Sequence, residues 1–107
     1  MAQLTLAELT EAMHAFVRDK GWYEPGSQRP QTLRNLAISL SLEAAEVLEH
    51  FQWRDAAPGE VEDRAALASE LADVALYLLQ IASLSGIDLE QAILDKLRLN
   101  YGRTWDK

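Results

Sequence analysis

Four stretches of the chain place apolar residues three and four positions apart, and no stretch alternates apolar with polar residues as a half-buried strand does. This spacing predicts four helices, at about 6–20, 32–54, 60–85 and 88–101. Gly21, Pro58-Gly59 and Gly86 separate them. Helices joined by short connections predict an all-α fold, a four-helix bundle.

The chain has 107 residues, the usual length of a single domain, so we expect one domain over residues 1–107. The absence of cysteine excludes disulfides, thiolate metal sites and a cysteine nucleophile. Ten Lys and Arg against 17 Asp and Glu give a net charge of −7. Proteins that bind nucleic-acid polymers neutralise phosphates with basic residues, so this charge argues against such a partner.

The most apolar stretch, residues 74–79, lies between Asp73 and Gln80 and is too short to cross a bilayer. The first five residues contain neither a basic region nor an apolar run of signal length. We therefore expect no membrane partner and a cytoplasmic location.

Two pairs of acidic residues interrupt the apolar faces of the second and third predicted helices. Glu43 and Glu46 are three residues apart, as are Glu70 and Asp73, so each pair shares one helix face. Glu43 stands in an apolar stripe where a leucine is expected. If the two apolar stripes face each other, the four acids meet in a partly buried patch.

Four carboxylates in such a patch repel one another strongly unless they are protonated or neutralised. An all-oxygen ligand set favours Mg²⁺ or Mn²⁺ over zinc. A di-iron bundle would need two Glu-x-x-His motifs, but only His14 lies three residues after a glutamate. The simpler interpretation is that these carboxylates lie on solvated helix faces. That interpretation is less attractive here, because two pairs both interrupt apolar stripes.

A Glu-x-x-Glu motif is followed, after 23 residues, by a Glu-x-x-Asp motif. This order resembles the signature of the MazG-like all-α nucleoside triphosphate pyrophosphohydrolases. Three strings in order, at residues 34–53, 70–78 and 96–103, look like the dCTP-pyrophosphatase-type branch of that family. The resemblance implies hydrolysis of a (deoxy)nucleoside triphosphate to a monophosphate and pyrophosphate, in housecleaning of the nucleotide pool. It also implies that Glu43, Glu46, Glu70 and Asp73 hold Mg²⁺. Either Glu46 or Glu49 would be the general base.

The resemblance further implies contacts with the substrate. Lys96 and Arg103 would bind phosphates, and Asn100 would lie near the sugar or base; the alternative is that these cations stabilise a helix C-terminus. Residues 21–31 contain two glycines and two prolines, which predicts a loop, and two adjacent aromatic residues. The aromatic residues expected to contact the base are Trp53, Tyr77 and Trp22; the alternative is packing in the core or, for Trp53 and Tyr77, at an interface.

Members of this family form dimers or tetramers with shared pockets, and the apolar second helix suits a homodimer or homotetramer. Pro30-Gln31 replaces the Phe-His that many relatives of this branch carry, which leaves the preferred base open. Two alternatives remain. One is a non-enzymatic helical interaction module, and the other is a nucleotide-binding relative without turnover.

Overall fold

The computed structural model describes residues 3–104, which form four α-helices and one 3-10 turn and contain no strand. The elements in chain order are α1 Leu6–Asp19, α2 Leu33–Glu49, the 3-10 turn η1 Pro58–Glu60, α3 Arg64–Leu84 and α4 Leu89–Tyr101. The predicted all-α class with four helices is confirmed.

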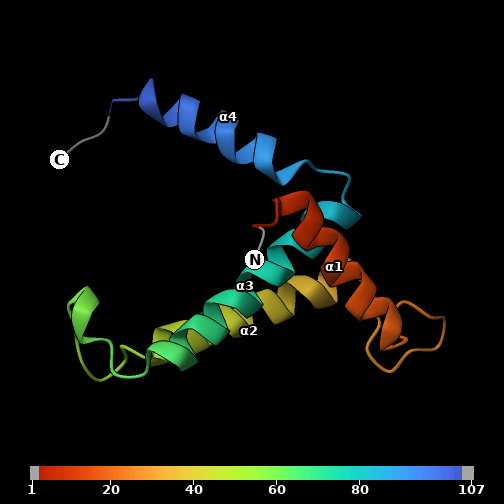
Figure 1. Ribbon diagram of the computed structural model, residues 1–107, viewed down its shortest axis with the longest axis horizontal. Coiled ribbons are helices and arrows are strands. Elements are labelled where there is room, and N and C mark those ends of the chain that lie inside the picture. Colours follow the sequence, from red (N-terminus) through yellow and green to blue (C-terminus); the bar gives the residue numbers. More distant parts are fainter. Residues whose placement is uncertain (1–2, 105–107) are drawn as a thin grey trace.

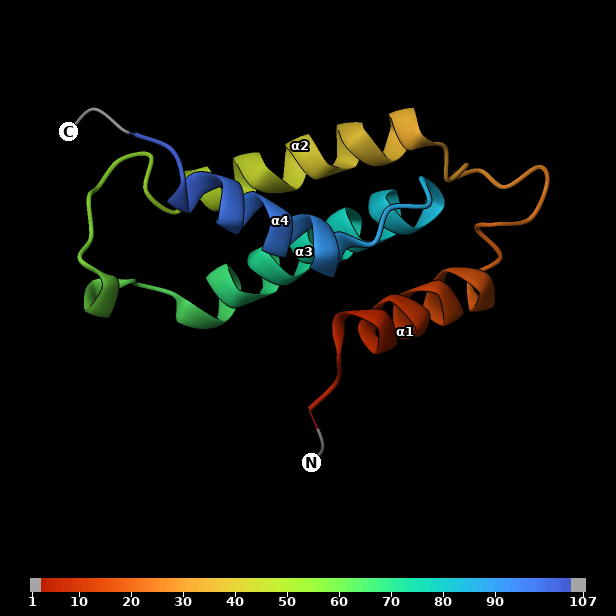
Figure 2. The ribbon, with the colours of Figure 1, turned by 90° about the horizontal axis from the view of Figure 1, so that it is seen from above.

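The centre of the fold is α3, which contacts each of the other helices (Figures 1 and 2). Most of its contacts are with α2, which runs antiparallel beside it, and α1 packs against α3 as well. The buried apolar residues come from these three helices: Met13, Val17, Leu36, Leu79 and Ala82. The core therefore lies where α1 meets the α2–α3 pair.

The fourth helix, α4, stands apart from the other three in Figure 1 and makes its main contact with α3. None of its residues is buried. Its apolar side chains remain about half exposed: Ile93, Leu94, Leu97 and Leu99. Within one chain, α4 adds little to the core.

Two predicted helix boundaries were wrong. The second helix ends at Glu49 rather than 54, because the backbone changes to three-residue hydrogen bonds such as Phe51 N to Leu48 O. The third begins at Arg64 rather than 60, because the Asp63 side chain accepts from Ala66 N and caps it. These shifts place residues 50–63 in a connection between the helices.

By length and composition, α3 is the one helix among the described residues that would reach across a bilayer, with 21 residues and a mean hydropathy of 1.4 in its most apolar window. The prediction considered only residues 74–79 and underestimated this helix. The central helix of a compact bundle meets the same criteria. Here α3 contacts three other helices and carries Glu70 and Asp73, so the two criteria alone do not place it in a membrane.

Candidate functional site

The four predicted acids lie around Glu43 at the contact between α2 and α3. The Glu43 Oε2 atom is buried and has no hydrogen-bond partner. Burial raises the pKa of the Glu43 carboxyl; the charges of Glu46 and Asp73, a side-chain hydrogen bond with Glu46 and the charge of Glu70 raise it further. The two helices therefore bring the other three acids within electrostatic reach of Glu43.

These carboxylates do not form a closed cage. Over residues 3–104, no three acidic or histidine side chains are arranged so that they could hold a metal ion. Glu70 instead forms a hydrogen bond with Nε2 of His50, the residue that caps the C-terminus of α2. A cation would therefore require rotation of the carboxylate side chains.

The composition of this patch still fits a hard divalent cation. All four acids offer oxygen ligands, which Mg²⁺ and Mn²⁺ prefer. The unpartnered Glu43 oxygen can be satisfied by a cation, whereas a neighbouring carboxylate can only repel it while both are ionised. The residues present thus fit the metal that the resemblance implies.

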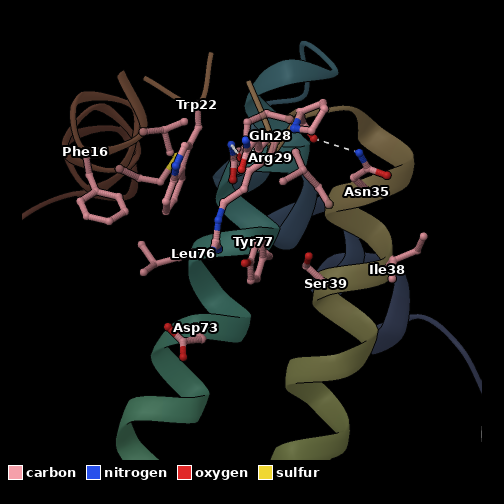
Figure 3. A pocket seen from close by; sticks show the side chains of 16 residues that line it. Phe16, Trp22, Gln28, Arg29, Asn35, Ile38, Ser39, Asp73, Leu76 and Tyr77 are labelled. Carbon is pink, nitrogen blue, oxygen red and sulfur yellow. Dashed lines mark hydrogen bonds between the residues drawn. The ribbon is translucent and has the colours of Figure 1, made fainter. Parts of the chain in front are cut away.

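A cleft of about 480 Å³ begins at Asp73 and extends toward the loop after α1 (Figure 3). Residues of α1, α2, α3 and residues 22–31 line it. Figure 3 shows Tyr77 one turn from Asp73 on α3, with Ser39 opposite on α2. The cleft thus joins the acidic patch to a largely apolar and aromatic space.

Aromatic and cationic side chains form the far part of this cleft. Gly21, predicted as a left-handed stop, has φ +75° and turns the chain after α1. Trp22 then packs edge-on against Phe16, with ring centroids 5.6 Å apart. The Arg29 guanidinium lies 5.2 Å from the Trp22 ring centroid (Figure 3). Trp22 and Tyr77, both predicted to contact the base, therefore line one cleft.

A network of neutral polar groups ties the loop to α3 beside the cleft. Gln80 is only 3% exposed, and its Nε2 donates to Gln31 Oε1 at 2.8 Å and to the Tyr23 hydroxyl at 3.2 Å. The Tyr23 hydroxyl is 2.6 Å from His14 Nδ1, and His14 Nε2 is 2.7 Å from Ser83 Oγ. These bonds fix the position of the loop.

Other predicted residues lie outside this cleft in a single chain. Trp53 is 88% exposed in the connection after α2. Glu49 lines a separate hollow with His50 and Arg54. Three further residues lie on α4 or just after it and do not line the cleft: Lys96, Asn100 and Arg103.

Sequence reasoning missed several residues that line the cleft: Phe16, Arg29, Gln31, Asn35, Ser39 and Gln80. Residues in the 21–31 loop follow no periodicity, so no pattern could indicate which of them turn inward. Gln80 did carry a signal, because it interrupts the most apolar stretch of the chain. A buried amide in such a stretch requires hydrogen-bond partners.

The chain matches the MazG-like family over residues 38–104. It is 35% identical over 104 residues to dCTP pyrophosphatase 1 of Rattus norvegicus and of Homo sapiens, an alignment that covers 92% of this chain and 58% of each relative. This chain therefore spans somewhat more than half the length of these curated relatives.

A shorter match of 48% identity over 40 residues is to a dATP/dGTP diphosphohydrolase of Salmonella phage PMBT28, covering 37% of this chain and 14% of the phage protein. The fold is similar to the crystal structure of a pyrophosphatase from Archaeoglobus fulgidus, with a TM-score of 0.75 and 31% identity, over 94% of this chain and 92% of that one. Taken together, the sequence match, the relatives and the fold show that the chain belongs to the MazG-like family.

Proposed function

We propose that this protein hydrolyses (deoxy)nucleoside triphosphates between the α and β phosphorus, releasing a monophosphate and pyrophosphate in a Mg²⁺-dependent reaction. The observation that carries the proposal is the buried, unpartnered oxygen of Glu43 among three other acids, next to a cleft lined by aromatic side chains. Such a site suits a ligand that brings a cation and phosphates at one end and a flat base at the other. The names of the relatives support the same reaction class.

Glu43, Glu46, Glu70 and Asp73 would hold the cation. Mg²⁺, or Mn²⁺ in its place, neutralises phosphate charge and favours ionisation of water when bound in such sites. Asp73 belongs both to the acidic patch and to the cleft, so it fixes which end of the cleft receives the phosphates. The base then points toward Trp22.

A carboxylate of this chain would accept the proton of the attacking water. The two candidates from the sequence were Glu46 and Glu49. Glu46 acts directly on the pKa of Glu43, whereas Glu49 lines the hollow beside Arg54. We therefore favour Glu46, acting through a carboxylate oxygen that does not bind the cation.

The residues outside the cleft fit the proposal if a second copy supplies them. The apolar side of α4 is exposed, and Lys96, Asn100 and Arg103 lie along this helix or just beyond it. We propose a homodimer or homotetramer in which α4 and Trp53 of one copy complete the cleft of another. Covering the exposed apolar surface would stabilise such an assembly. We also propose a cytoplasmic role in housecleaning of the nucleotide pool.

The experiment that tests this proposal incubates the purified protein with each of the common nucleoside and deoxynucleoside triphosphates, with Mg²⁺ and with EDTA. Anion-exchange chromatography then separates monophosphate plus pyrophosphate from diphosphate plus phosphate. We expect monophosphate and pyrophosphate in equal amounts, and only with the metal. Release of neither product would favour an interaction module or a binding protein without turnover.

A further inference from the structure

The hydrogen bonds of the buried amide Gln80 have a direction, and that direction determines what this side chain offers to the cleft. A glutamine amide has two N–H donors on Nε2 and one acceptor oxygen, Oε1. Both donors are used, one by Gln31 Oε1 and one by the Tyr23 hydroxyl. Because Gln80 lines the cleft and its nitrogen is fully engaged, Oε1 is the group left for a ligand.

The neighbouring bonds keep the amide in this orientation. Gln31 donates its own Nε2 to Arg29 O at 2.7 Å, so Gln31 Oε1 is the atom turned toward Gln80. A Tyr23 hydroxyl that accepts from Gln80 has its own hydrogen for His14 Nδ1, and His14 Nε2 can then donate to Ser83 Oγ. All the hydrogen bonds of this network are consistent in direction. This disfavours the alternative in which the amide oxygen and nitrogen of Gln80 exchange places.

Gln80 lies at the end of the cleft where the proposed function would place the base of a nucleotide. Gln80 is seven residues after Asp73 on α3, which is two turns or about 10 Å along the helix. Tyr77 lies between them, and all three side chains line the cleft. A nucleotide with its phosphates at Asp73 and its base beside Trp22 would therefore bring the far edge of the base to Gln80.

We infer that Gln80, oriented by Gln31 and Tyr23, selects nucleotides whose base carries an exocyclic amino group at that far edge, as cytosine and adenine do. This inference rests on the proposed function. An amino group donates to the amide oxygen, whereas uracil or hypoxanthine presents a carbonyl there and places acceptor against acceptor. Asn35 also lines the cleft, where one of its two Nδ2 hydrogens is donated to Pro30 O at 3.0 Å (Figure 3).

Two matched substrate pairs test the inference. The pairs dCTP with dUTP and dATP with dITP each exchange an amino group for a carbonyl, add a hydrogen to the adjacent ring nitrogen and keep the size of the base. We expect the wild-type kcat/KM to favour the amino member of at least one pair by about tenfold or more, the value of one well-placed hydrogen bond. Equal values within both pairs, in a protein that releases pyrophosphate, would overturn the inference and leave the proposed function standing.

Variants at Gln31 test the direction of the relay without changing the buried residue. Gln31→Glu keeps an acceptor opposite Gln80 Nε2, so the amino preference should remain. Gln31→Lys places a donor there, which turns the Gln80 oxygen toward position 31 and its nitrogen toward the cleft. The amino preference should then fall by about tenfold or reverse. A preference that Gln31→Lys leaves unchanged would refute the relay.

Gln80→Leu removes the amide itself and should bring the ratio within each pair close to one. Its folding is checked by circular dichroism and thermal denaturation, and the Gln31 variants carry the test if it does not fold. Ser83→Ala is the control, because Ser83 belongs to the same network but does not line the cleft. It should leave the ratio unchanged, and a shift there as large as that of Gln80→Leu would contradict the assignment to Gln80. If the wild type releases no pyrophosphate from any triphosphate, the proposed function fails instead.

Discussion

The two ends of the cleft bury polar groups in different ways. Near the loop, Gln80, Tyr23 and His14 are neutral groups that both donate and accept, and they satisfy one another through hydrogen bonds of 2.6–3.2 Å. At the other end, Glu43 has a buried oxygen without a partner, and its neighbours are further acids. Ionised carboxylates only accept, so they cannot satisfy one another. At the neutral end both Gln80 donors are satisfied within the chain and its Oε1 is left for a ligand, whereas the acidic end requires a cation.

Glu43→Gln and Asp73→Asn test this comparison with the largest expected effect. Each removes a charge that would hold the cation, and turnover should fall by more than about 100-fold at saturating Mg²⁺. Pyrophosphate release measures this. Glu11→Gln, the same change at an exposed residue of α1, is the control and should retain full activity. Full activity in either site variant would contradict the metal assignment.

The same variants should not destabilise the metal-free protein. The raised pKa of Glu43 means that the fold disfavours its ionised form at neutral pH, so removing that charge relieves repulsion. In EDTA we expect the Tm of Glu43→Gln to equal or exceed that of the wild type. A clear loss of stability there would show that the acidic end is satisfied without a cation.

A second prediction asks whether the acidic end is completed by another copy of the chain. Two variants should each be inactive. The double variant Lys96→Ala, Arg103→Ala loses the cations proposed to bind phosphates, and Asp73→Asn loses a carboxylate proposed to hold the metal. Refolding them together should restore activity, because an intact acidic patch then meets an intact α4. Random pairing of the two variants makes half of the dimers mixed. Each mixed dimer has one intact site out of two, so about a quarter of the wild-type activity should return.

Absence of recovery would mean that the α4 cations act within their own chain. Full activity of the double variant would refute their role in phosphate binding. Light scattering on the wild type gives an independent check, since a fully active monomer at micromolar concentration would contradict the proposed assembly.

A third prediction concerns the aromatic part of the cleft. Trp22 lies between Phe16 and Arg29 and would provide the face on which a base stacks. Trp22→Ala should raise KM by about tenfold or more, the usual effect of losing one stacking contact. The ranking of dNTPs should change, while Mg²⁺ affinity measured by calorimetry should stay nearly unchanged. An unchanged ranking would refute the role of the loop.

The sequence predicted the acidic end of the cleft better than its neutral end, for a physical reason. Two acids three residues apart on an apolar helix face would be buried at a cost in free energy. Such a pair can be recognised in the sequence without a structure. Each acidic pair could therefore be recognised from its spacing, and Glu43 and Asp73 were expected to meet on the condition that the apolar stripes of the two helices face each other. The partners of Gln80 come from the loop, and no spacing along the chain relates Tyr23 or Gln31 to position 80.

The fold showed the same limit. The ends of α1 and the start of α4 are set by local signals: Gly21 and the capping residues Thr5 and Asp88. These two helices were predicted to within about one residue. The connection after α2 was mispredicted, because its helix ends without glycine or proline and Asp63 was not recognised as a cap. The position of α4 depends on what covers its apolar side. The spacing of residues along one chain carries no information about that.

The smallest predicted effect measures how complete the neutral end is. Tyr23→Phe removes one hydroxyl and leaves His14 Nδ1 and one N–H of the buried Gln80 without their partner. Leaving buried polar groups unsatisfied should lower the free energy of unfolding by about 1–3 kcal/mol, measured by urea denaturation. Ser83→Ala removes a bond of the same network at an exposed position, where water can replace the hydroxyl, so its effect should stay below about 1 kcal/mol. Equal losses for the two variants would mean that water reaches the Tyr23 hydroxyl as freely as Ser83, and the two ends of the cleft would then differ only in charge.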